Sequence, residues 1–416
     1  MFKSSSLNVN HYYALLLLCF PLFYIIGSLF LNIAIVAISL IYFFNYSKIN
    51  YDKKIIFFFF LIFVYFLINS IFSENKLYSF YKSTAYFRYL FFIFGLLYLL
   101  LNISRNLLKS VSKLFIFLSI LLVIDIAFEF FYGKDIFGNS ASSLNYNRIS
   151  GPFGDELIVG FFLLYFGFSS WGLFLKFYKV DKKIYYFLFS ILIIYAVYIT
   201  GERNAFYSSL IFLSFLVIFD KNFRKVTSLV LITILILFYV SNKYNVVNNK
   251  YSLESIIQIK NNVNEKQINK TNSIDKIPRI ILNSQWVHHY RSAFEIFKTS
   301  PIIGSGFKTF RIACPSNENS KKYLCSSHPH NIYFELLSDT GVIGLLFFLT
   351  IIFYPIIIFF RNINNLDFSS KIFFALFLTY IFPFKPHGSL FTTSFATLLW
   401  FLYTLNLYSI KNDRNK

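Results

Sequence analysis

The sequence predicts an all-α, polytopic membrane protein with one large loop on the exterior side of the membrane. Of its 416 residues, 56% are hydrophobic and only 14% are charged, a larger apolar share than soluble proteins usually have. Apolar runs long enough to cross a membrane recur along the chain. Lysine and arginine gather in alternate connections between these runs. Together these observations predict about twelve transmembrane helices.

The predicted spans divide the chain into three parts. Residues 1–242 are expected to hold transmembrane helices 1–9, residues 243–330 the large exterior loop with short helices, and residues 331–416 helices 10–12 and a cytoplasmic tail. An even number of spans places both ends on the same side. The mainly apolar runs lie near 11–26, 28–45, 55–72, 84–101, 114–131, 156–175, 184–200, 204–219, 226–242, 331–360, 372–384 and 389–409.

Lysine and arginine indicate which side each connection faces. The connections around 48–54, 105–113, 176–183, 221–225 and 361–371 are rich in these residues, as is the tail after 410. Cytoplasmic connections of membrane proteins carry the excess of lysine and arginine, so this set is predicted to be cytoplasmic. The loop at 243–330 must then face the periplasm or cell exterior. The first apolar run passes into a second without a small-residue cleavage site, which predicts a retained helix.

The net charge of +20 does not predict a nucleic-acid partner. Much of this charge belongs to the cytoplasmic connections, and the abundant Phe and Tyr lie in the spans without an RNA-binding motif around them. We therefore expect contacts with membrane lipids and no nucleic acid.

Two of the three cysteines, Cys314 and Cys325, lie in the predicted exterior loop. In an oxidising compartment they can form a disulfide, which by chain-entropy estimates would contribute about 3 kcal/mol of stability. The alternative is a zinc site made by these cysteines with His328 and His330, although the spacing of the cysteines is long for a zinc knuckle.

A helix is predicted just before Ser300 and Pro301. Its apolar face predicts an amphipathic helix that lies against the membrane or the mouth of the helix bundle. The residues on this face are Trp286, Tyr290, Ala293, Phe294 and Phe297.

The most informative segment places two histidines where the polar loop meets the next span. Pro329 suits the first position of a helix, which puts His328 near the N-cap and His330 in the first turn. The N–H groups at a helix start disfavour imidazolium, so His330 is expected to be a neutral base. The alternative is a histidine that only caps the helix.

The helical repeat extends this prediction into the span. His330, Gly341 and Gly344 share one face, and the two glycines would let a neighbouring helix approach closely. The same repeat makes Glu335 and Asp339 point elsewhere.

Arginines stand at several predicted exterior positions. Arg203 lies between two spans with almost no loop, and burying a charged arginine there costs free energy unless it binds an anion. The alternatives are an ion pair with Glu202 or a side chain that reaches the lipid headgroups. Arg291 lies four residues before Glu295, so it forms either an ordinary surface pair or a guanidinium site for phosphate. Arg148 lies in a loop just before a span.

Arg88 in the fourth span is either a buried counter-charge or a side chain that reaches towards headgroups. The sequence has no glycine-rich ATP loop, no Asp-x-Asp pair and no HExxH motif. Any reaction would therefore draw its energy from an activated substrate already in the membrane.

These residues resemble the bacterial superfamily of O-antigen ligases and O-antigen polymerases. The ligase pattern of His, then Asn, Ser or Gln, nine residues, Gly, two residues and Gly is matched by His330, Asn331, Gly341 and Gly344. The exterior-loop pattern Pro-x-x-Gly-x-Gly is matched at 301–306. The segments 148–156, 200–203 and 382–389 resemble the family's other exterior connections.

The resemblance implies a glycosyltransferase of the bacterial inner membrane whose active site faces the periplasm. It would move a glycan from an undecaprenyl-diphosphate carrier to an acceptor hydroxyl of lipid A core or of another glycan, with no cofactor, metal or nucleotide. His330 would take the acceptor proton, while Arg203, assisted by Arg291, would hold the diphosphate. His288 or His289 is the alternative to Arg291.

Substrate contacts are expected from Arg148, His289, His328 and Asn331. The histidine pattern favours a ligase, with a polymerase as the first alternative. A lipid-linked oligosaccharide flippase or another transporter is the second. Transporters usually place functional charge at the midplane of paired halves, whereas here it gathers at the exterior face.

Overall fold

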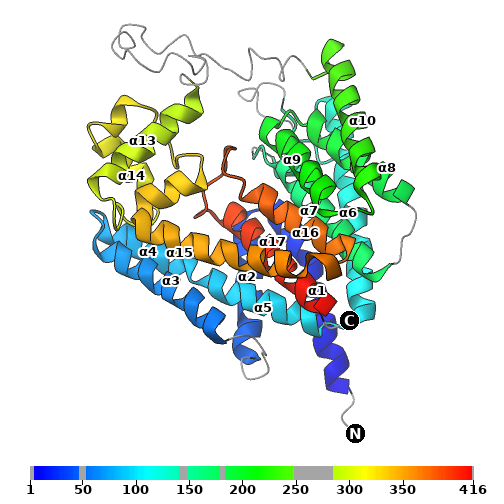
Figure 1. Cartoon of the computed structure of the whole chain (residues 1–416), viewed down its shortest axis with the longest axis horizontal. Helices are drawn as coiled ribbons and strands as arrows, with labels where there is room; N and C mark the ends of the chain where they lie inside the picture. The colour runs from blue at the N-terminus through cyan, green and yellow to red at the C-terminus, as the bar shows by residue number, and fades with distance from the viewer. Residues whose placement is uncertain are drawn as a thin grey trace.

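The computed structural model is all helical and has no β-strand within the residues it describes, which are 4–45, 53–139, 148–154, 156–178, 183–244, 246–247 and 284–414 (Figure 1). A helix lies at the place of each predicted span. These helices are α1 (Ser4–Ile26), α2 (Ser28–Phe44), α3 (Lys53–Ile71), α5 (Arg88–Asn102), α6 (Arg105–Tyr132), α7 (Val159–Phe177), α8 (Lys183–Ile199), α9 (Arg203–Phe219), α10 (Arg224–Lys243), α15 (Ile332–Asn362), α16 (Phe368–Tyr380) and α17 (Thr393–Arg414).

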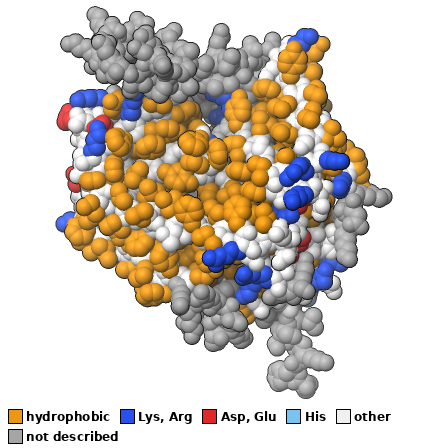
Figure 2. All heavy atoms as spheres, in the orientation of Figure 1, with side chains coloured by type: hydrophobic (Ala, Val, Ile, Leu, Met, Phe, Trp, Pro, Cys, Tyr) orange, Lys and Arg blue, Asp and Glu red, His pale blue; other side chains and the backbone are white. Residues whose placement is uncertain are grey.

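Several of these helices are suited to a membrane. Among the described residues, five helical segments are long and apolar enough to cross one: 76–102, 105–132, 159–177, 224–243 and 332–365. Six more apolar helices have 10–17 residues. Large apolar side chains of α15 such as Phe353, Ile357 and Phe360 are exposed. Figure 2 shows hydrophobic side chains over most of the middle of one face, with Lys and Arg towards its edges, as expected of a surface that contacts lipid.

The two C-terminal helices join the two sides of the bundle. Helix α17 packs against α2, α5 and α15, whereas its neighbour α16 packs against α7 and α9. Two shorter helices, α13 (Gln285–Thr299) and α14 (Phe310–Ser316), pack on each other and on α15. Figure 1 shows them together at one end of the molecule, on the same side as the start of α15.

The fourth predicted span belongs to a longer helical segment, residues 76–102. In it α4 (Lys76–Tyr86) and α5 meet at Phe87, which has helical backbone angles of φ −54° and ψ −28°. Arg88 therefore begins α5 and is half-buried, with its guanidinium 5.1 Å from the centre of the Tyr89 ring and Nη2 donating to Thr393 Oγ1 at 3.3 Å.

Of the predicted loop at 243–330, the structure describes residues 243–244, 246–247 and 284–330. The helix predicted before Ser300 is α13. Of its predicted apolar face, Ala293 is buried and Tyr290 stacks on Phe334 of α15, with 5.0 Å between ring centres. His289, Ser292, Ala293 and Ile296 are buried, whereas Phe294 is 45% exposed. The reason is that α13 packs against α14 and α15, which select a face with small side chains.

Candidate active site

Asn331, not His328, caps α15. Its side-chain oxygen accepts hydrogen bonds from the backbone N–H groups of Tyr333 and Phe334 at 3.0 and 3.3 Å, and its Nδ2 donates to Pro383 O at 2.9 Å. The helix therefore begins at Ile332, and the predictions that His328 lies near the N-cap and His330 in the first turn were wrong. Asparagine is a strong N-cap residue, and this preference outweighs the signal of Pro329. Asn331 was expected to bind substrate, but it is buried and holds the backbone.

His330 lies at the centre of a cluster of aromatic rings. Its ring centre is 4.1 Å from that of His328, 4.8 Å from that of His289 and 5.2 Å from that of Trp286. His330 has a left-handed backbone with φ 57°, a conformation that costs energy for a residue with a side chain. The cluster thus joins the residues before α15 to the first turns of α13, 40 residues earlier in the sequence.

The cluster keeps its imidazoles neutral. Burial is the largest cause, and with the neighbouring His328 and His289 it lowers the pKa of His330 to about 3. Burial likewise lowers the pKa of His328 to about 4 and that of His289 below its usual value. The neutral base expected from the sequence therefore has a different cause: buried neighbours, and not the start of a helix.

The stability of the protein should consequently depend on pH in the acid range. In the unfolded chain these histidines take up protons near pH 6.5, whereas in the folded protein they resist protonation until about pH 3–4. Stability present above pH 6.5 should thus be lost as pH falls towards 4. Thermal unfolding midpoints in detergent between pH 7.5 and 4.5 test this prediction. A His328→Gln/His330→Asn variant should show a weaker dependence, and an equal dependence would contradict it.

A single loop between α16 and α17, residues 381–392, supports the cluster; we call it the connecting loop. His387 N donates to His330 O at 2.7 Å, while the buried His387 ring places Nε2 2.9 Å from Tyr380 O. Asn204 Nδ2 donates to Pro386 O at 2.8 Å. The connecting loop therefore contacts both the histidine cluster and the start of α9.

Two buried carboxylates of α15 hold neighbouring loops in place. Glu335 accepts hydrogen bonds from Leu390 N at 2.7 Å and from the hydroxyl of Ser389, and Asp339 accepts from Phe310 N at 2.8 Å. The sequence predicted only that these two acids point away from the face of His330, and it did not predict that both are buried. Because each binds a loop segment distant in sequence, the helical repeat alone could not place them.

The segment 301–306 packs against a break in α15. Gly341 has a φ of 64°, so α15 consists of two helices that meet there. Across the break, Ser305 N donates to Ser338 O at 2.9 Å and Val342 N donates to Pro301 O at 2.9 Å. Gly341 was predicted on a helical face beside His330; it instead breaks the helix so that the Pro-x-x-Gly-x-Gly segment can pair with its backbone.

Replacement of Gly341 by alanine should destabilise the protein strongly. The new Cβ would lie 2.3 Å from Ile302 O, and alanine disfavours this backbone conformation, so we expect a loss of roughly 3 kcal/mol. Gly133→Ala is the matched control, because Gly133 has a φ of 75° but open space around it. Thermal unfolding should show a much larger decrease for Gly341→Ala; equal decreases would mean that the packing adds nothing.

The segments that carry Arg148 and Arg203 meet at the α8–α9 end of the bundle. Ile149 N donates to Thr200 O at 3.1 Å, which brings the segment of Arg148 to the turn before Arg203. Glu202 accepts from Gly160 N and Phe161 N at 2.7 and 3.1 Å and so binds the start of α7. Arg148 is half-buried, and its Nε is buried without a hydrogen-bond partner. Asn204 links this end of the bundle to the connecting loop.

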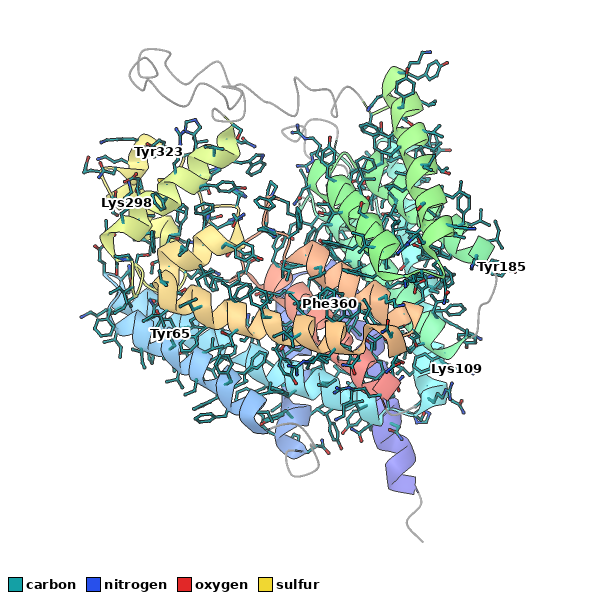
Figure 3. All side chains as sticks on the ribbon, in the orientation of Figure 1. Tyr65, Lys109, Tyr185, Lys298, Tyr323 and Phe360 are labelled. Atoms are coloured by element: carbon teal, nitrogen blue, oxygen red, sulfur yellow. A yellow bond between two sulfur atoms is a disulfide. The ribbon has the colours of Figure 1, made fainter. Side chains whose placement is uncertain are left out.

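Arg291 lies away from the histidine cluster. It is exposed, and its guanidinium lies 5.8 Å from the ring centre of Tyr323, which Figure 3 shows at the outer end of the molecule beside α13. The expected pair with Glu295 is absent from the described residues, since Glu295 binds Lys298 at 2.7 Å. His289, the alternative left open by the sequence, occupies the position beside His330.

Cys314 and Cys325 form a disulfide. The residue before Cys325, Leu324, accepts a hydrogen bond from Ser292 Oγ at 2.7 Å and lies 3.0 Å from His289 Nδ1. The disulfide therefore holds the segment that orients His289. Sulfurs bonded to each other are not thiolates, so the alternative zinc site is not formed by these residues.

The comparison with protein families agrees with this geometry. Residues 188–349 match the model of the O-antigen ligase family. This segment is similar to O-antigen ligases. It includes Arg203, His289, His328, His330 and Asn331, and it supports the family resemblance inferred from the sequence. Arg148 and the connecting loop lie outside the matched residues. No curated protein matches the chain.

Proposed function

We propose that the protein is a membrane glycosyltransferase that moves a glycan from an undecaprenyl-diphosphate carrier to an acceptor hydroxyl. The connecting loop carries this proposal, because it hydrogen-bonds to His330 and to Asn204, the neighbour of Arg203. One loop thus contacts the backbone of His330 and the start of α9, the helix that Arg203 begins. A base and an anion-binding group are what the displacement of a diphosphate from a sugar requires.

The reaction follows from these positions. His330 takes the proton of the acceptor hydroxyl as the acceptor oxygen bonds to the anomeric carbon. The bond from that carbon to the diphosphate oxygen breaks, and the carrier diphosphate leaves with the electron pair. Arg203 and Arg148 stabilise this negative charge. The charge of the bound donor also favours imidazolium, which raises the pKa of His330 from about 3 towards the working pH. The proposed mechanism uses no metal and no nucleotide.

Within this class we propose an O-antigen ligase that uses lipid A core as the acceptor. The similarity of residues 188–349 to O-antigen ligases and the spacing of His330, Asn331, Gly341 and Gly344 support this choice. A polymerase would use another repeat unit as the acceptor. Gel analysis of lipopolysaccharide from a deletion strain separates the two functions. Loss of long chains with accumulation of carrier-linked glycan is expected; chains that stop at one repeat would indicate a polymerase.

We further propose that the chain crosses the bacterial inner membrane twelve times, with both termini in the cytoplasm and the active site facing the periplasm. Lys109, from a lysine-rich connection, and Tyr323, near α13, lie at opposite ends of the molecule in Figure 3, as this topology requires. An impermeant thiol reagent should label Lys298→Cys in intact spheroplasts of a Cys19→Ser strain. Labelling that needs lysed membranes would reverse the orientation.

A further inference from the structure

A second group of cations lies at the other end of the connecting loop. Lys308 and His330 are the two non-glycine residues with a left-handed backbone among those the structure describes, with φ 60° and 57°. Such strain persists where surrounding contacts hold it and often marks a functional position. Lys308 Nζ donates to Phe391 O at 2.8 Å, so its amine lies on the connecting loop near the start of α17.

Arg88 approaches the same end of the loop. Its Nη2 donates to Thr393 Oγ1 at 3.3 Å, two residues after the partner of Lys308, while its Nε is buried without a hydrogen-bond partner. A buried guanidinium N–H without a hydrogen-bond acceptor destabilises the fold, so this donor is available to an acceptor on a bound ligand.

Two more cations, Arg311 and Lys82, act on the Lys308 amine. Burial is the largest cause that lowers its pKa to about 8; the charges of Arg311, Lys82 and Arg88 lower it further, and that of Glu335 raises it. Lys82 Nζ lies 5.3 Å from the centre of the Tyr78 ring, whose hydroxyl is also buried and without a partner.

Two buried acids of α15, Glu335 and Asp339, lie near this group. Both oxygens of Glu335 accept hydrogen bonds, from Ser389 and Leu390, and one oxygen of Asp339 accepts from Phe310 N. None of the ion pairs of the described chain includes the four cations. Cations that repel one another at a partly buried position form a site for a multiply charged anion.

We propose that Lys82, Arg88, Lys308 and Arg311 bind phosphate groups carried by the acceptor. The inference rests on the proposed function and adds a second anion site to it. A hydroxyl that displaces a diphosphate attacks the sugar from the face opposite the departing oxygen. Asn204, the residue after Arg203, binds Pro386 O, and Lys308 binds Phe391 O, with His387 and its partner His330 between them along the loop. The acceptor therefore approaches from the side of the four cations.

Direct binding tests this site with the full-length protein in detergent. The double variant Lys82→Ala/Arg311→Ala should bind phosphorylated lipid A core roughly tenfold more weakly or worse, because two charge-assisted contacts are lost. Its affinity for undecaprenyl-diphosphate-linked glycan should not change. Wild-type protein should bind chemically dephosphorylated lipid A core about as weakly as the variant binds the phosphorylated form. The charge-conserving Lys82→Arg/Arg311→Lys variant should retain most of the affinity.

Lys298→Ala/Lys321→Ala is the matched control, since it removes two lysines that are 52% and 48% exposed from the same exterior segment. An equal loss in this control, or an equal loss of binding to phosphatidylglycerol vesicles in the test variant, would indicate general attraction to anionic surfaces and overturn the site. Weaker donor binding would assign the cations to the diphosphate. If wild-type protein transfers glycan but the test variant binds the acceptor normally, the acceptor site is wrong and the proposed function stands. If wild-type protein does not transfer glycan, the proposed function is wrong.

Discussion

Replacement of His330 by asparagine should lower glycan transfer by about a hundredfold or more, the contribution of a positioned general base. Asparagine removes the imidazole but tolerates the left-handed backbone at this position, so the fold should persist. His330→Ala should lose as much activity with a somewhat larger loss of stability. Turnover is measured with purified protein, diphosphate-linked donor and acceptor, in the presence of a chelator.

The control is His288→Ala, because His288 lies against Tyr323, with 6.0 Å between ring centres, and outside the cluster. His328→Ala should have a milder effect than His330→Asn, since His328 packs against the base and does not take the proton. Near-normal turnover of a folded His330→Asn protein would rule out the general base. Loss of wild-type activity in chelator would instead indicate a required metal ion.

Replacement of Arg203 by alanine should lower transfer by about 10²–10³, the usual cost of removing one group that stabilises a developing oxyanion. Arg203→Lys should recover part of this loss, because lysine retains the charge but lacks the paired donors that match a diphosphate. The decrease should appear in kcat for a donor with a poor leaving group, and it should shrink when the leaving group is better.

Replacement of Arg291 by alanine should leave glycan transfer nearly unchanged, contrary to the role predicted from the sequence. The sequence assigned Arg291 a role at the diphosphate, whereas its exposed guanidinium lies over Tyr323, so transfer should remain close to that of wild-type protein. A decrease as large as that of Arg203→Ala would show that α13 turns towards the donor during catalysis.

The positions of the helices could be predicted from the sequence because a long apolar run leaves few alternatives to a helix in a membrane. The break within α15 could not. Gly341 fits a continuous helical pattern, and its left-handed backbone is selected by the loop segment at 301–306, more than 30 residues away.

The candidate site was predicted in part. His330 and Arg203 stand at polar interruptions between apolar runs, where function is readily recognised. The connecting loop acts through the carbonyls of Pro383 and Pro386 and the N–H of His387, and backbone groups have no sequence signature. Arg291 and His289 lie two residues apart on α13, so a rotation of about 200° separates them, and only the packing partner of the helix decides which faces His330.

The connecting loop has a consequence for the order of substrate binding. Asn204 and His330 bind one part of the loop, and Lys308 binds another part. A shift of the loop backbone on binding one substrate therefore alters the site of the other. The two affinities are then linked, and the linkage is reciprocal: donor must change the Kd of acceptor by the same factor by which acceptor changes the Kd of donor. Substitution of Asn204 by alanine, which releases one contact, should reduce that common factor towards one and leave each affinity measured alone nearly unchanged.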